Sequence, residues 1–285
     1  MEYDWYKGEI FSHYGTIKRA RGSYLYTAKG IRLVDMYQEG GRAILGWSNS
    51  SGKAMLMLKN TIDRGLTGSF VSDHMHRAKK AVFEITGVNP ENHHIGFFAS
   101  KEKTLRAIAH YSNSQIADAD TEHLPLEQCL QNQNIPIWRA WGNETTLPGG
   151  ILFVIPPFAW AKNIYICIFN TDKNKIITPS DDFAPCFFAA LSRAFYDFQK
   201  RKNTRSESDW QIFDNVLSEY FTRTGPYLQF NDTAGNYKDF VIHCIEHGIL
   251  LSPEKIIPSI VPFDVTGGDL KKLQRNPFRG HMDTV

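Results

Sequence analysis

The 285-residue sequence has little net charge, few cysteines and no long hydrophobic run. Its 32 basic residues are balanced by 30 acidic ones, which argues against a dedicated nucleic-acid or membrane-surface protein. The four cysteines form no Cys-x-x-Cys pair, which excludes a zinc ribbon and a dithiol redox motif. The longest apolar stretch, residues 151–161, contains two prolines and is too short to span a bilayer.

The amino-terminal residues MEYDWYKGEIF lack the hydrophobic segment of a signal peptide. We therefore expect a soluble, cytoplasmic protein that binds neither nucleic acid nor membrane. The composition, 42% hydrophobic and 22% charged, is that of a globular chain with one large domain or two coupled ones. An aromatic content of 13% indicates a thick core or a large interface.

Several catalytic motifs are also missing. The sequence has no G-x-S-x-G element, no P-loop and no glycine-rich dinucleotide fingerprint after a strand. His93 and His94 are adjacent, and His74 and His76 stand two positions apart, a spacing that does not share one face of a helix. With no HExxH motif or carboxylate-rich set near them, we expect no metal site.

Hydrophobic patterning predicts a chain that alternates helices and strands. Residues 24–37 form two short β-rich runs around Gly30, which is typical of a hairpin. A buried strand over 94–99 is followed at once by a helix over 100–111, a βα unit. The apolar runs 151–155 and 164–169 predict central strands.

The carboxyl-terminal half continues the alternation. Residues 183–200 predict a long helix, and the charge-dense residues 200–209 predict a solvated hinge. Beyond the hinge the patterns predict helices over 210–224 and 237–247, strands over 227–230, 249–251 and 256–261, and a terminal helix over 269–274.

Motifs at both ends of the chain, in this order, resemble the class-III aminotransferases. The amino end has Arg-Gly-Ser-Tyr-Leu-Tyr at 21–26, Gly-Ile-Arg-Leu-Val-Asp at 30–35, and a glycine-rich run at 40–46, with Trp47 where the family has histidine. The carboxyl end has His-Gly-Ile-Leu-Leu-Ser-Pro at 247–253 and Gly-Asp-Leu at 268–270. The resemblance implies the type-I pyridoxal-phosphate fold of the ω-aminotransferase and glutamate-1-semialdehyde aminomutase group.

The family holds the cofactor phosphate at a strand-to-helix joint that reads Ser-Gly-Thr/Ser-Glu-Ala. By resemblance, the matching joint here comprises Ser100, Lys101, Glu102, Lys103 and Thr104. Exposed N–H groups and the helix dipole favour an anion at such a joint, but Glu102 would repel phosphate, which Lys101 and Lys103 could partly offset. The alternative is an ordinary βα joint in which Ser100 caps the helix.

The resemblance implies two further cofactor contacts, a Schiff-base lysine and a hydroxyl from the neighbouring subunit. Lys162, which follows the apolar run 151–161, is the candidate lysine, although its turn lacks glycine and a surface lysine is the alternative. Ser180 stands where the family has the threonine of the neighbouring subunit, but Asp181 and Asp182 follow it. No apolar strand ends in the Asp-Glu pair whose aspartate would contact the pyridine nitrogen.

We therefore predict an α/β protein with a reduced type-I pyridoxal-phosphate-transferase-like large domain over 51–204. An α+β small domain is expected from both chain ends, 1–50 and 205–275, with a tail over 276–285. The short hairpin at 24–37 is marginal alone, so it should pack against the carboxyl-terminal strands.

Three functions remain open on the sequence, of which the third is a different, unspecified small-molecule enzyme that uses a vestigial cleft. The first is a degenerate aminotransferase-like homodimer that binds a small molecule or a partner and holds no tight cofactor. The second is an active pyridoxal-phosphate aminotransferase or aminomutase that uses Lys162. Fold alone does not decide between them.

Overall fold

A computed structural model describes residues 3–48, 53–113, 124–142, 146–160, 164–172 and 175–279. The chain divides into two compact units. The first unit combines Met1–Ser51 with Thr204–Val285, and the second is the continuous segment Gly52–Asn203. Each unit is described by itself.

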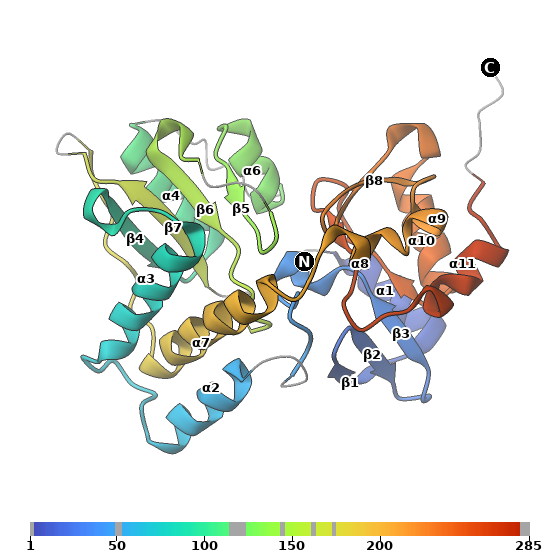
Figure 1. The fold of residues 1–285 in the computed structure, drawn as a ribbon, viewed down its shortest axis with the longest axis horizontal. Helices are drawn as coiled ribbons and strands as arrows, with labels where there is room; N and C mark the ends of the chain where they lie inside the picture. Colours follow the sequence, from blue (N-terminus) through green and yellow to red (C-terminus); the bar gives the residue numbers. More distant parts are fainter. Residues whose placement is uncertain are drawn as a thin grey trace. The chain divides into compact units, whose positions relative to one another are not determined.

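The unit formed by Gly52–Asn203 is built on a four-stranded mixed sheet. Its spatial order is β4-β7-β6-β5 (Figure 1). Strand β7 is antiparallel to both neighbours, whereas β5 and β6 are parallel. The strands span His93–Phe98 (β4), Ile137–Trp138 (β5), Ile151–Val154 (β6) and Tyr165–Asn170 (β7).

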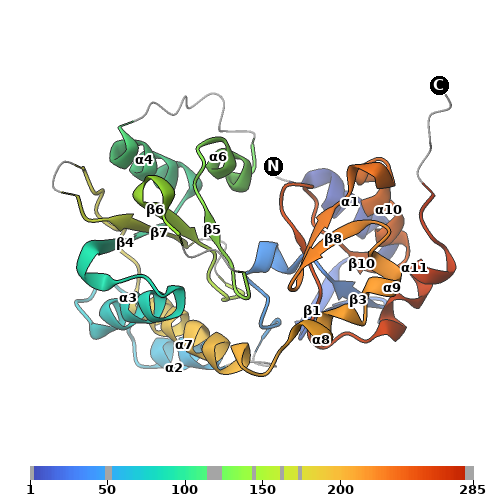
Figure 2. The same ribbon diagram turned by 45° about the horizontal axis from the view of Figure 1, so that its top comes forward.

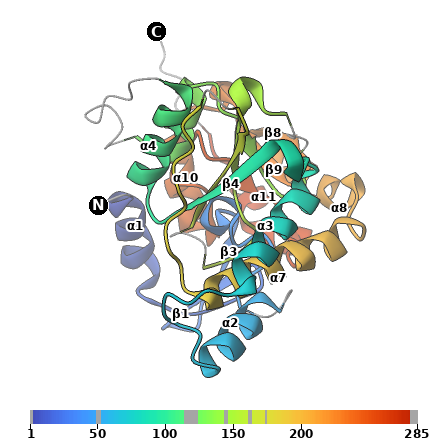
Figure 3. The same cartoon turned by 90° about the vertical axis from the view of Figure 1, so that its left-hand side faces the viewer.

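Helices cover both faces of this sheet (Figure 2). Helices α4 and α6 lie on one face, and α3 and α7 lie on the other, with α7 between α3 and α2 (Figure 3). A two-sided cover explains why β6 is buried at every position and apolar throughout. The helices span Ala54–Asp63 (α2), Asp73–Thr86 (α3), Lys101–Ser112 (α4), Leu126–Asn132 (α6) and Pro185–Lys202 (α7), and short 3-10 turns cover Pro90–Asn92 (η2) and Pro148–Gly150 (η3).

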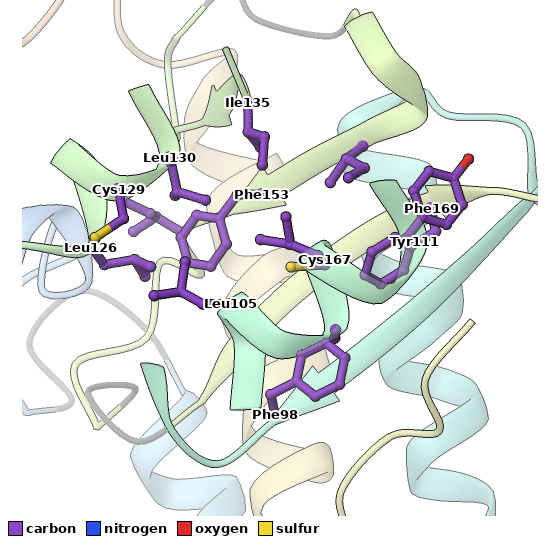
Figure 4. Close-up of a cluster of buried hydrophobic side chains, with 14 residues drawn as sticks. Phe98, Leu105, Tyr111, Leu126, Cys129, Leu130, Ile135, Phe153, Cys167 and Phe169 are labelled. Atoms are coloured by element: carbon purple, nitrogen blue, oxygen red, sulfur yellow. The ribbon is translucent and has the colours of Figure 1, made fainter. Parts of the chain in front are cut away.

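One continuous core fills the space between the sheet and α4 and α6 (Figure 4). Phe153 from β6 and Phe169 from β7 are each 1% exposed or less. Both belong to one buried cluster with side chains of the covering helices, and the Phe169 ring lies 5.2 Å from that of Tyr111 on α4. On the other face, aromatic rings of α7 pack edge-on against the sheet, as Phe188 does on Phe97 at 5.1 Å. Aromatic side chains therefore form a large part of the core of this unit.

The other unit joins the two ends of the chain in one sheet. Strands β1, β2 and β3 form an antiparallel meander, and β10 extends it by pairing in parallel with β3. Helix α1 lies against α10. The elements are α1 (Asp4–Tyr14), β1 (Ile17–Arg21), β2 (Tyr24–Thr27), β3 (Arg32–Asp35), η1 (Gln38–Gly41), α10 (Tyr237–Glu246) and β10 (Ile249–Leu250).

A second, three-stranded sheet completes this unit, in the order β11-β9-β8. The helix expected over 210–224 is wrong in its last part, because Phe221–Thr224 is strand β8. The turn at Gly225 returns the chain so that β8 pairs with β9. The remaining elements are α8 (Glu207–Gln211), α9 (Asp214–Leu217), β9 (Tyr227–Phe230), η5 (Asp232–Ala234), β11 (Ser259–Ile260), η6 (Gly267–Leu270) and α11 (Lys271–Arg275).

Helix α1 was not predicted from the sequence. Its apolar pattern is weak, and only Tyr6 and Tyr14 are buried. The Tyr6 hydroxyl donates to the Leu251 carbonyl at 2.8 Å, and the Tyr14 hydroxyl donates to the Ile245 carbonyl at 2.7 Å. The helix is thus fixed by polar contacts with residues more than 200 positions away. Among the described residues, no helix is both long and apolar enough to cross a membrane.

Gly150, just before β6, offers a test of the core packing. Its φ is +81°, and an added Cβ would lie 2.6 Å from the Tyr111 hydroxyl, which donates to the Asn170 carbonyl. Gly149 has a similar φ of +68°, but no described atom lies within 4 Å of its added Cβ. Both alanine variants should lose about 1–2 kcal/mol to the left-handed backbone, and Gly150→Ala should lose about 1–3 kcal/mol more through overpacking.

The measurement is urea unfolding of the two variants and the wild type. Equal losses for Gly149→Ala and Gly150→Ala would contradict the predicted close packing of Tyr111 against the turn.

Candidate functional site

The joint between β4 and α4 is the position where the resemblance places a phosphate. Ser100 caps α4: its hydroxyl oxygen accepts from the Lys103 N–H at 3.2 Å. Thr104 is fully buried, and its hydroxyl donates to the Ser100 carbonyl at 2.8 Å. The Thr104 hydroxyl is therefore not presented to a ligand, and that of Ser100 serves as the helix cap.

The lysine and glutamate at the start of α4 are engaged locally. The Lys101 ammonium donates to the Leu124 carbonyl. The pKa of Glu102 is lowered, first by a hydrogen bond from the Ser100 hydroxyl and next by one from its own backbone N–H. A carboxylate thus already receives donors at the helix N-terminus, where negative charge is favoured.

Residues 180–181 return to the same place and lie along the free edge of β4. The Phe97 N–H donates to the Ser180 hydroxyl oxygen at 3.1 Å, and the Asp181 N–H donates to the Phe97 carbonyl at 2.8 Å. These two bonds cover an edge strand that would otherwise present unpaired backbone groups. The structure therefore brings Ser180 and Ser100 to one end of β4, within a single chain.

The Asp181 carboxylate lies at this joint and accepts from two of its donors. Its Oδ2 accepts from the Ala99 N–H at 2.7 Å, and its Oδ1 accepts from the Lys103 Nζ at 2.7 Å. The aspartate side chain is 21% exposed and the lysine side chain 56% exposed, so the lysine side of the ion pair remains in water. A phosphate bound here would have to displace the Asp181 carboxylate from the Ala99 N–H and the Lys103 ammonium. The residues present at this joint do not fit the phosphate of pyridoxal phosphate.

Lys162, the candidate Schiff-base lysine, lies outside the described residues. The structure therefore relates Ser100, Lys101, Thr104 and Ser180 to one another, but not to Lys162.

Arg223, on strand β8, is also engaged by acidic side chains of its own unit. Its Nε and Nη2 donate to the two carboxylate oxygens of Asp214 at 2.7 and 2.8 Å. A third nitrogen donates to Glu207 at 2.5 Å. The Asp214 hydrogen bonds, above all, raise the pKa of Arg223 above its ordinary value. A bidentate pair of this kind leaves little of the guanidinium for a substrate carboxylate.

The four cysteines are buried and carry no disulfide. Burial raises the pKa of Cys167 and of Cys244. A buried thiol with a raised pKa is a poor nucleophile at neutral pH. We assign no covalent chemistry to them.

A small cavity of about 160 Å³ lies in the unit that contains both chain ends. It is lined by Arg205, Asp209, Trp210, Ile212 and Phe263, among others. Arg205 and Asp209 form an ion pair at 3.3 Å. Sites for cofactor-sized ligands usually measure about 300–1,000 Å³, so this cavity is suited only to a smaller molecule.

Asp35 is the other buried carboxyl group at a family motif. Its Oδ2 accepts from the Trp47 indole N–H at 2.6 Å, and its Oδ1 accepts from the backbone N–H groups of Tyr37 and Gln38. These bonds fix the strained turn 38–41, in which Gln38, Glu39 and two glycines all have positive φ. Burial raises the pKa of Asp35 to about 6, although the three hydrogen bonds oppose the shift.

Two groups of residues were missed on the sequence. Asp181 was recognised as a misplaced charge but not as the partner of Lys103, because 78 positions separate the two. His243, Glu246 and His247 were missed, although their i, i+3, i+4 spacing on one helix was visible in the sequence.

No family model matches the chain. Two bacterial relatives, each described as an uncharacterized protein, align with most of it. The protein from Treponema pallidum is 23% identical over 310 residues, covering 90% of this chain and 92% of the relative. The protein from Borreliella burgdorferi is 24% identical over 263 residues, covering 92% and 90%.

Solved structures define the fold. Ornithine delta-aminotransferase of Plasmodium falciparum superposes with a TM-score of 0.62 at 12% identity, covering 91% of both chains. Acetylornithine aminotransferase of Elizabethkingia anophelis gives 0.60 at 12% identity, covering 95% of this chain and 97% of the other. An omega-transaminase of Sphaerobacter thermophilus gives 0.61 at 9% identity, covering 90% and 88%.

The chain therefore has the class-III aminotransferase fold in shortened form. The fold predicted from the sequence motifs is confirmed at this level. Identities of 9–12% carry the fold and not the reaction.

Asp35 gives a prediction with a definite sign in pH. A carboxyl whose pKa rises from 3.8 to about 6 on folding binds more protons in the folded state, so its contribution to stability falls as pH rises from about 4 to 6. The stability advantage of the wild type over Asp35→Asn should therefore shrink between pH 4 and pH 7, by up to about 3 kcal/mol.

Urea unfolding followed by tryptophan fluorescence at several pH values measures this difference. An advantage that grows with pH would show that the three hydrogen bonds outweigh burial and favour the ionised form.

Proposed function

We propose that this protein is a degenerate member of the aminotransferase fold, which binds a small molecule or a partner rather than transferring amino groups. The observation that carries the proposal is the Asp181 carboxylate on the Ala99 N–H and the Lys103 ammonium. An internal anion at that joint replaces the phosphate anchor on which a pyridoxal-phosphate enzyme depends.

A second observation supports the proposal independently. Arg223 is paired with Asp214 and Glu207, which leaves little of its guanidinium for a substrate carboxylate.

The alternative function is an active pyridoxal-phosphate aminotransferase or aminomutase with Lys162 as the Schiff-base lysine. It is favoured by the fold neighbours, which are named ornithine, acetylornithine and omega-aminotransferases. This alternative requires four side chains to exchange their present hydrogen-bond partners in order to reach a phosphate. They are Ser100, Lys101, Thr104 and Ser180.

A cofactor titration distinguishes the two. Full-length protein mixed with equimolar pyridoxal phosphate should show no stoichiometric Schiff-base absorbance band, because the phosphate anchor is filled. Borohydride trapping and peptide mapping should give scattered lysine labelling at most. A stoichiometric yellow adduct, lost in Lys162→Ala but kept in the surface control Lys59→Ala, would establish the alternative.

The same titration with Asp181→Ala tests the cause. Removing the carboxylate frees the Ala99 N–H and the Lys103 ammonium, so inorganic phosphate should bind at least about tenfold more tightly, the equivalent of one charge-assisted hydrogen bond. The neighbouring Asp182→Ala, an exposed carboxylate, is the matched control and should behave as the wild type. No gain in Asp181→Ala would remove the main support for the proposal.

We further propose that the protein is a homodimer. Helix α2 packs on α7 by one side, while α2 and the loop after it expose a run of large apolar side chains. These are Leu56 (43% exposed), Met57 (37%), Ile62 (44%), Phe70 (54%) and Val71 (107%). Exposed apolar groups concentrated in one segment are typical of a surface covered by a partner.

Light scattering should give twice the chain mass of 32.5 kDa at micromolar protein. The double variant Leu56→Glu/Ile62→Glu should shift the protein to monomer, because it places charge in the apolar surface. Lys59→Glu, on the exposed part of the same helix, should leave the dimer intact. A monomeric wild type would contradict the proposal.

A further inference from the structure

The carboxyl-terminal turn of α10 gathers three potential metal ligands. His243 and Glu246 belong to the helix, and His247 is its C-cap. Residues three and four positions apart lie on the same face of a helix. One ligand atom from each of the three side chains lies within 4.8 Å of the others, and the two imidazole rings are 4.4 Å apart.

Hydrogen bonds fix the orientation of both imidazoles. His243 Nε2 lies 2.9 Å from the Asn276 carbonyl, and His247 Nδ1 lies 2.7 Å from the His243 carbonyl. A carbonyl oxygen only accepts, so each of these nitrogens carries the proton. In the neutral rings the lone pairs then belong to His243 Nδ1 and His247 Nε2. Histidine ligands of metal ions are held by such outer hydrogen bonds to carbonyl or carboxylate groups.

The electrostatics of this turn also favour a cation. The C-terminal end of a helix carries partial negative charge, and the carboxylate of Glu246 adds a full charge. Glu246 is exposed, whereas both histidines are half-buried. The carboxylate can therefore move toward an ion while the rings stay in place.

The donor set identifies the class of ion. Two imidazole nitrogens and one carboxylate oxygen suit zinc and neighbouring transition metals, whereas calcium and magnesium require oxygen ligands. Metal–ligand distances of about 2.0–2.2 Å place two ligands of one ion about 3–4 Å apart, so small side-chain rotations suffice. We propose that His243, Glu246 and His247 form a site for a divalent transition-metal ion of the zinc class, with water completing the coordination.

Such a site would also affect the last described residues of the chain. The ring of His243 contacts Phe278 at 5.6 Å, and Phe278 in turn contacts Phe240 of α10 at 5.3 Å. The Phe278 N–H donates to the Tyr220 hydroxyl. An ion that holds His243 would therefore reinforce the contact between α10 and residues 276–278, and it should stabilise the folded state by mass action.

The first experiment titrates chelator-treated full-length protein with zinc chloride in a calorimeter and with cobalt chloride in a spectrophotometer. One ion should bind per chain, the melting temperature should rise with zinc, and cobalt should show the visible bands of a tetrahedral or five-coordinate N/O site. A thiolate-to-cobalt charge-transfer band would assign the metal to a cysteine and overturn the proposal. The cysteine to exclude is Cys244, which lies in the same helix and is fully buried.

Variants locate the site. His243→Ala and His247→Ala should each weaken zinc binding at least about tenfold, because even outer partners of metal ligands contribute this much. Glu246→Gln should weaken it less and should leave the histidine-dependent binding measurable. His247→Gln, which conserves side-chain volume better, provides a second test if the alanine variant does not fold, as judged by circular dichroism.

The matched control is His74→Ala/His76→Ala, a pair on α3 whose i, i+2 spacing cannot chelate one ion. It should bind zinc as the wild type does. The proposal is wrong if the wild type shows no saturable zinc binding, or if folded His243 and His247 variants bind as tightly as this control.

Discussion

The unit formed by Gly52–Asn203 depends on hydrogen bonds between Phe97 and residues 180–181. Strand β4 is the outer strand of its sheet, and an uncovered edge would expose backbone donors and acceptors. The segment that covers this edge uses one backbone and one hydroxyl contact. It also delivers the Asp181 carboxylate to the start of α4. The same short segment therefore protects the sheet edge and brings a carboxylate to the start of α4.

Ion pairs within the chain engage basic side chains in both units. Lys103 pairs with Asp181, and Arg223 pairs with both Asp214 and Glu207. The last turn of α10 shows the opposite arrangement, since three lone-pair donors gather there. The proposed metal site at the end of α10 and these internal ion pairs therefore lie on a fold whose solved examples include aminotransferases.

Local patterns predicted those elements whose stability is mainly local or that have one consistent apolar face. The hairpin around Gly30, the βα joint at Ser100 and the long helix α7 belong to this group. Helix α1 was missed because its buried tyrosines are anchored to carbonyls more than 200 positions away. Strand β8 was mistaken for helix because its pairing with β9, and not its own composition, selects the extended backbone.

The sequence by itself determined the cap at Ser100 and the spacing of His243 and His247, because each depends on residues within a few positions of one another. It also carried the family resemblance, through the order of short motifs along the chain. The tertiary structure decided whether those groups are available. Asp181 reaches Ala99 across 82 positions, and Asn276 orients His243 across 33. A side chain's type and local spacing give its possible chemistry, but its electrostatic partners come from distant segments, so only the folded chain decides which ligand it can bind.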